Sequence, residues 1–199
     1  MTRNVAASVH GRLLHLARSR GVDFNALLDR YALERLLYRM SVSEHAGAFV
    51  LKGAQLLLTY TDGAHRPTRD LDLLGLGRED AEALAEDFRD ICGVGIDDDG
   101  VVFDPGSIEV RAIREVATHG GQRVRLVAHL GTARVRLQVD VGFGDVITPE
   151  PEWVTFPTLL DAPEPRLHGY PLATVVAEKL EALSSLGLAT SRMKDVYDL

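Results

Sequence analysis

Residues 52–75 read KGAQLLLTYTDGAHRPTRDLDLLG, and the acidic pair near the end of this stretch decides the expected fold. Asp70 and Asp72 lie inside an apolar run, and residues two apart on a β-strand point to the same face, roughly 6–7 Å apart. The leucines can then face a core while both carboxylates face one spot on the other side. Such a negative spot must be compensated by water or by a cation, so the stretch predicts a strand that carries either solvent-facing acids or a cation site.

The composition restricts the class of protein. A chain of 199 residues can build one sizeable core, or a core plus a small appended domain. Hydrophobic content of 46% with a mean hydropathy near zero indicates a soluble globular protein, and the longest apolar runs are too short to span a bilayer. The single cysteine and the lack of a secretory h-region predict a cytoplasmic location. The net charge of −7 argues against a protein that coats nucleic acid generally.

Helices and strands alternate through the first half of the chain. Apolar periodicity predicts a helix over 4–20, ended by Gly21, and a second helix capped by Asp23. A short buried strand over 48–52 then runs into a glycine turn and a helix over 54–60. We expect a loop over 62–67, a strand over 68–75 and a helix over 78–92.

The second half is rich in strands. Residues 95–106 are acidic and typical of turns, and they precede three segments, 107–116, 121–130 and 132–143, in which apolar and polar residues alternate. The proline-rich segment 148–171 is expected to be extended and draped over the body. Helices are predicted from Pro171 to Gly187 and, capped by Ser191, at the end of the chain.

This order of elements predicts an α+β fold, a mixed β-sheet flanked by helices with a C-terminal helical region. We divide the chain into residues 1–147, which hold the N-terminal helices and the core, and residues 148–199, which hold the connector and the C-terminal helical region.

A third acid extends the candidate site. Asp140 is the one acid on the polar face of the strand over 132–143, and it would meet Asp70 and Asp72 if the two strands were neighbours. Three carboxylates at close range are costly unless a cation binds them, and Mg²⁺ prefers oxygen ligands. Two such ions can hold the attacking and leaving oxygens of an in-line displacement. The alternative is an ordinary solvent-facing strand with acids.

Two further features suit a bound triphosphate. Gly53, between a buried strand and a helix start, lets phosphates approach backbone N–H groups, although such a glycine is also common in ordinary turns. Lys179 lies on a helix with four apolar positions that we expect to face the body: Val175, Val176, Leu180 and Leu183. This lysine either reaches the triphosphate or is a solvated lysine between Glu178 and Glu181.

Arginines on the strand faces form either a surface that tracks phosphates or ordinary solvated sheet charge. They are Arg111, Arg123, Arg125, Arg134 and Arg136.

Four motifs together resemble a known family, the nucleotidyltransferase toxins of AbiEii type within the DNA polymerase β-like nucleotidyltransferase superfamily. They are LKGA, RPTRDLDLL, QVDVGFGD, and PLATVVAEKLEAL with RMKDVYDL, and the resemblance covers residues 49–199. It implies a nucleotidyltransferase-like sheet and a Mg²⁺-dependent enzyme of a type IV-like toxin–antitoxin system. Such an enzyme transfers NMP from NTP to an RNA acceptor, as at the tRNA 3′ end, blocks translation, and is restrained by a cognate antitoxin encoded nearby.

The resemblance also implies roles for individual residues. Asp70, Asp72 and Asp140 would hold Mg²⁺, two ions with bound NTP, and Asp140 would help to deprotonate the attacking hydroxyl. Lys179 and Asp195 would complete the catalytic set. The nucleotide would be bound by Lys52, Gly53, Thr68, Arg69 and Lys179, and Thr68 would contact phosphate or bear modification.

The sequence departs from the family in two places and leaves alternatives open. Ala54 stands where the family usually has serine or glycine, and the helical region stops at Leu199 where relatives usually continue. The acceptor would alternatively be a protein or a small molecule, or the chain would be a degenerate module that binds nucleotide without catalysis. A metal-dependent nuclease is less favoured, because Gly53 and Lys179 suit a triphosphate better than a scissile strand.

Overall fold

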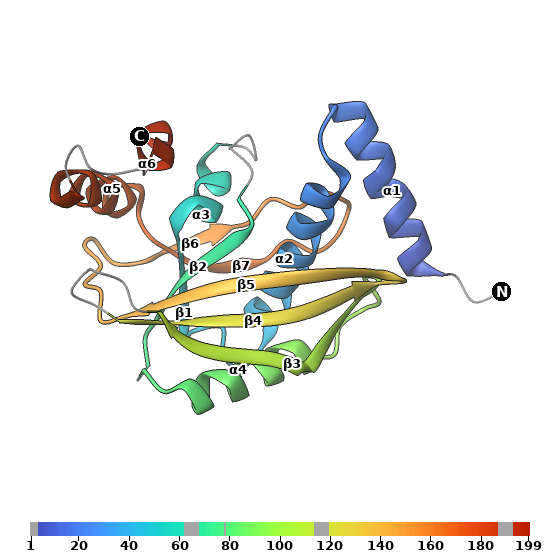
Figure 1. The fold of residues 1–199 in the computed structure, drawn as a ribbon, viewed down its shortest axis with the longest axis horizontal. Coiled ribbons are helices and arrows are strands. Elements are labelled where there is room, and N and C mark those ends of the chain that lie inside the picture. The colour runs from blue at the N-terminus through green and yellow to red at the C-terminus, as the bar shows by residue number, and fades with distance from the viewer. Residues whose placement is uncertain (1–3, 62–67, 78, 114–119, 187–192) are drawn as a thin grey trace.

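The computed structural model describes residues 4–61, 68–77, 79–113, 120–186 and 193–199, and it confirms the α+β class (Figure 1). The predicted loop over 62–67 and the predicted caps at Gly187 and Ser191 lie outside these ranges. In chain order the elements are α1 (Val5–Arg20), α2 (Phe24–Val42), β1 (Phe49–Lys52), α3 (Gly53–Tyr60), β2 (Asp70–Gly75), α4 (Ala81–Gly93), β3 (Val101–Ile113), β4 (Gly121–Leu130), β5 (Ala133–Phe143), β6 (Glu152–Thr155), β7 (Arg166–Gly169), α5 (Leu172–Leu186) and α6 (Met193–Asp198).

The seven strands of the described ranges form one mixed sheet in the order β3-β4-β5-β2-β1-β7-β6. The two central pairings matter most for the site: β2 runs parallel to β5 and antiparallel to β1. The pair β1–β7 is also parallel, while β3–β4, β4–β5 and β6–β7 are antiparallel. Because β2 lies between β5 and β1, it brings the acidic pair to the middle of the sheet.

Apolar and polar residues alternate along the strands, and the apolar ones form the buried face of the sheet. Leu71, Leu73, Val139 and Val141 are at most 1% exposed, and they belong to a core shared with α2 and α4. Helix α2 contacts β5 and α4 contacts β3, so these helices cover this apolar face. Helix α3 contacts β1 and β2 and starts beside the acidic pair.

The predicted N-cap Asp23 and the predicted end of α1 at Gly21 are confirmed, and Asn4, the first residue of the predicted helix over 4–20, is an N-cap as well. Asn4 and Asp23 accept hydrogen bonds from Ala7 and Ala26, each satisfying a backbone N–H that has no partner inside its helix. Gly21 ends α1 in the left-handed conformation, with φ of 63°.

Two regions differ from the expectation. Strand β3 already begins at Val101, inside the segment predicted to be turns, and a register shift between Asp104 and Glu109 accommodates the Pro105–Gly106 pair. The segment 148–171 is not merely draped over the body, because β7 pairs with β1 and β6 pairs with β7. Prolines flank these short strands instead of interrupting them, which is why the composition concealed them. The proposed division at residue 147 stays a prediction.

Helix α2 buries charges that hold this connector in place. Glu34 and Arg35 are 0% exposed and form an ion pair of 3.0 Å. Glu34 also accepts the N–H of Leu159 at 2.8 Å, and Arg35 donates to the carbonyl of Pro163 at 3.0 Å. These bonds tie residues 159–163 to α2 and thereby position the two strands on either side.

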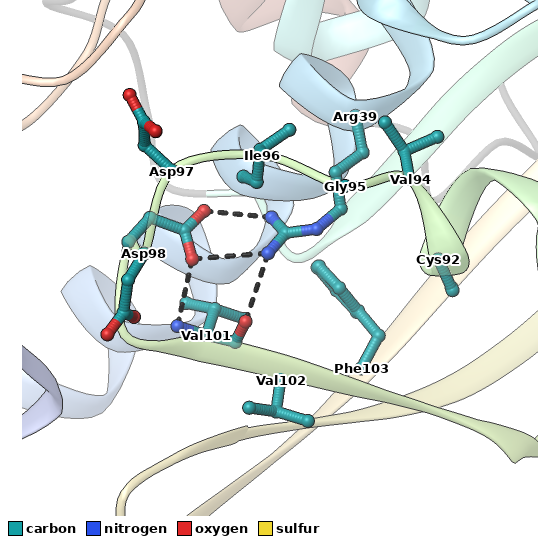
Figure 2. Close-up of a pocket in the computed structure, with 11 residues that line it drawn as sticks. Arg39, Cys92, Val94, Gly95, Ile96, Asp97, Asp98, Val101, Val102 and Phe103 are labelled. Carbon is teal, nitrogen blue, oxygen red and sulfur yellow. Dashed lines mark hydrogen bonds and ion pairs between the residues drawn. The ribbon is translucent and has the colours of Figure 1, made fainter.

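Arg39 makes a comparable link from α2 to β3, shown in Figure 2. Its guanidinium donates to both carboxylate oxygens of Asp99, at 2.8 and 3.2 Å, and to the carbonyl of Val101 at 3.0 Å. The Asp99 carboxylate also accepts the N–H of Val101, so the start of β3 is fixed to the helix. None of the helices within the described ranges is long and apolar enough to cross a membrane.

Candidate active site

Four charged residues form a row across four adjacent strands. The register pairs Lys52 of β1 with Asp72 of β2, Asp72 with Asp140 of β5, and Asp140 with Arg123 of β4. Residues paired in register share a face of the sheet, so two carboxylates lie side by side between two cations. The strand of Asp140 is therefore the neighbour of the strand of Asp70 and Asp72, as the sequence analysis required.

The side chains of Asp140 and Asp70 have neighbours on this face. Arg123 donates from Nε and Nη2 to the two oxygens of Asp140, at 2.8 and 2.7 Å, in a bidentate pair. Gln138 donates from Nε2 to Asp70 at 3.1 Å. The three carboxylates do not form a group with all ligand atoms within 4.8 Å of one another; within the described ranges only Glu44, His45 and Asp90 do so.

Gly53 fits against Asp72 because it lacks a side chain. It begins α3 with φ of 69°, a left-handed conformation that costs other residues free energy. A Cβ atom at this position would lie 2.7 Å from both Cβ and Cγ of Asp72, closer than real Cβ contacts. The start of α3 at Gly53 therefore lies directly beside one of the central acids.

Lys52 is held by acids outside the row. Its Nζ donates to Asp145 at 2.6 Å and to Glu178 at 2.9 Å, and it lies 5.1 Å from the ring centroid of Tyr170. Burial lowers the pKa of Lys52, but Glu178 and Asp145 outweigh it and leave this pKa above its ordinary value. Lys52 stays positively charged and joins β1 to α5 and to the loop after β5.

Thr68 and Arg69 precede β2 at the edge of the site. The carbonyl of Thr68 accepts a hydrogen bond of 3.1 Å from Gln55, a buried residue of α3. Arg69 is exposed and its Nε lies 3.5 Å from Asp29 of α2. Both residues lie close to Asp70 along the chain, and their roles toward nucleotide stay predictions.

Lys179 is not a solvated lysine. It is 9% exposed, and its Nζ donates to Asp198 of α6 at 2.6 Å. Asp195 also belongs to α6, but its side chain lies outside the part of the chain that the structure describes. The expectation that Val176 and Leu180 face the body is wrong, because they are 37% and 53% exposed, whereas Val175 is buried. Helix α5 is turned so that Lys179 lies on its buried side.

The residues present fit a magnesium ion. Asp72 and Asp140 supply carboxylate oxygens, the ligands that Mg²⁺ prefers, from neighbouring strands that fix their backbones. Gly53 keeps the space beside Asp72 free of a Cβ, so a phosphate could share such an ion. Arg123 would have to release at least one oxygen of Asp140 first.

A second feature of the surface is separate from this site. A hollow of about 260 Å³ lies over α2 and the start of β3 and is lined by Arg39, Cys92 and residues 94–99 and 101–103 (Figure 2). It contains none of the predicted site residues. Burial raises the pKa of the Cys92 thiol to about 12, so this thiol is not a nucleophile near neutral pH.

Several residues that surround the row were not predicted from the sequence to belong to the site. Asp145, Glu178 and Tyr170 bind or contact Lys52, and Asp198 pairs with Lys179. Asp145 and Asp198 lie inside the motifs QVDVGFGD and RMKDVYDL, so a signal was present for them. Tyr170 is joined to Asp145 by a hydrogen bond of 3.0 Å, and its position depends on β7, which the sequence did not reveal.

Comparison with solved structures defines the class of fold. The chain is similar to the Helicobacter pylori protein JHP933, with a TM-score of 0.55 and 15% identity over 87% of this chain and 64% of that one. It is also similar to an H. pylori protein described as a candidate nucleotidyltransferase, with a TM-score of 0.53 and 15% identity over 89% and 67% of the two chains. The chain thus spans about two thirds of the length of these neighbours, and the likeness shows a nucleotidyltransferase-like fold.

A family comparison gives the particular assignment. Residues 35–199 match the model described as nucleotidyl transferase AbiEii toxin, type IV TA system. The chain therefore belongs to the AbiEii nucleotidyltransferase toxin family. The match begins at residue 35, inside α2, whereas the resemblance in the sequence covers residues 49–199. The family match confirms this resemblance. No curated protein matches the chain.

Proposed function

We propose that this chain transfers a nucleotide from an NTP to an RNA acceptor, the 3′ end of tRNA, with release of pyrophosphate. The observation that carries the proposal is the register pairing of Asp72 with Asp140, directly beside the Gly53 start of α3. Two adjacent carboxylates next to a helix N-terminus suit a metal ion and a triphosphate at the same place. Modified tRNA would block translation in the cytoplasm, and a cognate antitoxin would restrain the enzyme.

The chemistry follows from positioning and charge neutralisation. The hydroxyl oxygen of the acceptor attacks the α-phosphorus of the NTP, the bond to the pyrophosphate oxygen breaks, and the hydroxyl proton passes to Asp140. Backbone N–H groups at the start of α3 bind phosphate oxygens, and Lys179 neutralises their charge. Asp70, Asp72 and Asp140 would hold Mg²⁺, which would supply further neutralisation of the phosphates.

Arginines on the same face of the sheet support a polyanionic acceptor. Arg123 and Arg125 of β4 pair in register with Asp140 and Gln138, and Arg136 and Arg134 continue the polar face of β5. Arg111 extends this polar face onto β3, and its side chain also forms an ion pair of 2.9 Å with Glu109. These side chains lead away from the acid row along the sheet, as phosphates of an RNA backbone would require.

The test incubates the protein with each labelled NTP and with bulk tRNA, total protein extract or aminoglycosides, with and without Mg²⁺. We expect labelled tRNA and pyrophosphate only with Mg²⁺, and no product from the variant Asp72→Asn. Glu109→Gln is the matched control, since Glu109 is an exposed acid on the same face of the sheet. Label found in protein or in a small molecule, and not in tRNA, would show that the acceptor is not tRNA.

One observation favours a module without catalysis: both oxygens of Asp140 are engaged by Arg123. Binding of NTP without pyrophosphate release, with every acceptor tested, would establish that alternative and contradict the proposal.

A further inference from the structure

A second group of candidate metal ligands lies away from the acid row. Glu44 and His45 belong to the link between α2 and β1, and Asp90 belongs to α4. One ligand atom from each of the three residues lies within 4.8 Å of the other two. The link enters β1 at Phe49, whereas Lys52, the member of the acid row, stands at the opposite end of this strand.

The spacing of two of these atoms suits a pair of metal ligands. His45 Nε2 and Asp90 Oδ2 are 3.4 Å apart, a contact that is also a long hydrogen bond. Two ligands about 2.0–2.1 Å from a tetrahedral zinc ion are separated by about 3.3–3.4 Å. The imidazole and the carboxylate therefore already have the separation that zinc requires.

The other ring nitrogen of His45 faces a second carboxylate. Nδ1 lies 3.4 Å from Oδ1 of Asp87, which is one turn before Asp90 on α4. Histidines that bind metals usually direct their second ring nitrogen to a carboxylate, which fixes the tautomer with its lone pair toward the metal. The backbone of His45 is also held, because its N–H donates to Ser43 Oγ at 3.1 Å and its carbonyl accepts from Ala48 at 2.9 Å.

We propose that Glu44, His45 and Asp90 bind a zinc ion, with Asp87 orienting the imidazole and water at the fourth position. Imidazole nitrogen and carboxylate oxygen are both ligands that zinc accepts. The ion would join the α2–β1 link to α4 and so brace the end of the sheet opposite Lys52. The proposal does not depend on nucleotidyl transfer, and its rival is a His45 ring that only pairs with Asp87 and Asp90.

Calorimetric titration with Zn²⁺ tests the proposal. The protein used carries Asp70→Asn and Asp72→Asn, so that the acid row does not bind the added metal. We expect one zinc ion per chain, a higher melting temperature with zinc, and Co²⁺ absorption of tetrahedral intensity. His45→Gln and Asp90→Asn in the same background should abolish all three signals.

Two further variants sharpen the result. Asp87→Asn should keep the stoichiometry and weaken the zinc affinity about 10- to 100-fold, as for other residues that orient metal-bound histidines. His15→Gln, at an exposed position on α1, should change nothing. Circular dichroism verifies that each variant is folded. Absence of stoichiometric zinc binding, or binding that persists in folded His45→Gln and Asp90→Asn, would overturn the proposal.

Discussion

Asp72 of β2 and Asp140 of β5 are direct register partners on parallel neighbouring strands. They come from segments 68 residues apart in sequence, as do Asp70 and its partner Gln138. Two like charges held this close oppose folding unless cations offset them. Lys52 and Arg123 occupy the next positions of the row on either side. The register therefore sets two carboxylates between two cations, and the proposed metal site depends on this arrangement.

Removing one central charge should separate function from stability. We expect Asp72→Asn to lower nucleotide transfer at least about 1,000-fold, while the free energy of unfolding changes by less than about 1 kcal/mol because repulsion from Asp140 is relieved. Labelled-NTP incorporation and urea unfolding measure the two effects. A variant that unfolds more easily by several kcal/mol would mean that Asp72 is chiefly structural.

Gly53 should tolerate no side chain. We expect Gly53→Ala to cost about 2–4 kcal/mol, of which about 1–2 comes from the positive φ and the rest from displacement of Asp72. Gly131→Ala is the matched control, since Gly131 has φ of 59° but a Cβ there would meet only Ala6 at 3.8 Å. Equal losses in denaturant unfolding for the two variants would contradict a specific fit against Asp72.

Arg123 should compete with a divalent ion for Asp140. We expect Arg123→Gln to bind Mn²⁺ about three- to tenfold more tightly than the wild type, because the partly exposed bidentate pair is worth about 1 kcal/mol. Arg125→Gln removes the same charge two residues further along β4 and should have a smaller effect. Electron paramagnetic resonance of free Mn²⁺ gives the affinities. Weaker binding by Arg123→Gln would show that this arginine supports the metal site instead.

Lys52 should be needed to hold α5 in place. Lys52→Met leaves Asp145 and Glu178 without their shared cation, and we expect a loss of about 2–4 kcal/mol in the free energy of unfolding. Adding Glu178→Gln should restore part of this loss, since it removes one of the acids that the lysine neutralises. Urea unfolding of the single and double variants checks the prediction, and strictly additive losses would exclude the coupling.

Glu34 should make the protein less stable as the pH rises. Burial raises its pKa from 4.5 to about 7, and Arg35 and the Leu159 N–H offset this only in part. Between about pH 4.5 and 7 the folded protein holds a proton that the unfolded chain has released, so stability falls through this window, by up to about 3 kcal/mol.

The variant Glu34→Gln lacks this titrating group, and its free energy of unfolding should fall less between pH 5 and 8 than that of the wild type. Chemical unfolding at several pH values compares the two proteins. Parallel curves for both would rule out Glu34 as the source of the pH dependence.

Local patterns predicted most of the fold. Alternation identified β4 and β5 and the faces of Asp72 and Asp140, while Gly21 identified the end of α1 and Asp23 identified the start of α2. These features depend on residues near one another in sequence. Strands β6 and β7 were missed because each has four residues and acquires its partner from a distant segment.

The candidate site was predictable only in part, for the same reason. The acids and Gly53 carry a local signature, whereas the bonds of Arg123 to Asp140 and of Lys52 to Glu178 join distant elements. Burial of Glu34 and Arg35 was equally hidden, since charged residues in a helix are ordinarily solvated.

The most direct test is a crystal structure with Mn²⁺ and a non-hydrolysable NTP analogue, read from the anomalous signal of manganese. The account predicts a manganese peak within coordination distance of Asp72 and Asp140, with triphosphate oxygens on the same ion beside Gly53. Nucleotide bound elsewhere, or a structure in which Asp140 keeps both bonds to Arg123 and no manganese lies on Asp72, would contradict it.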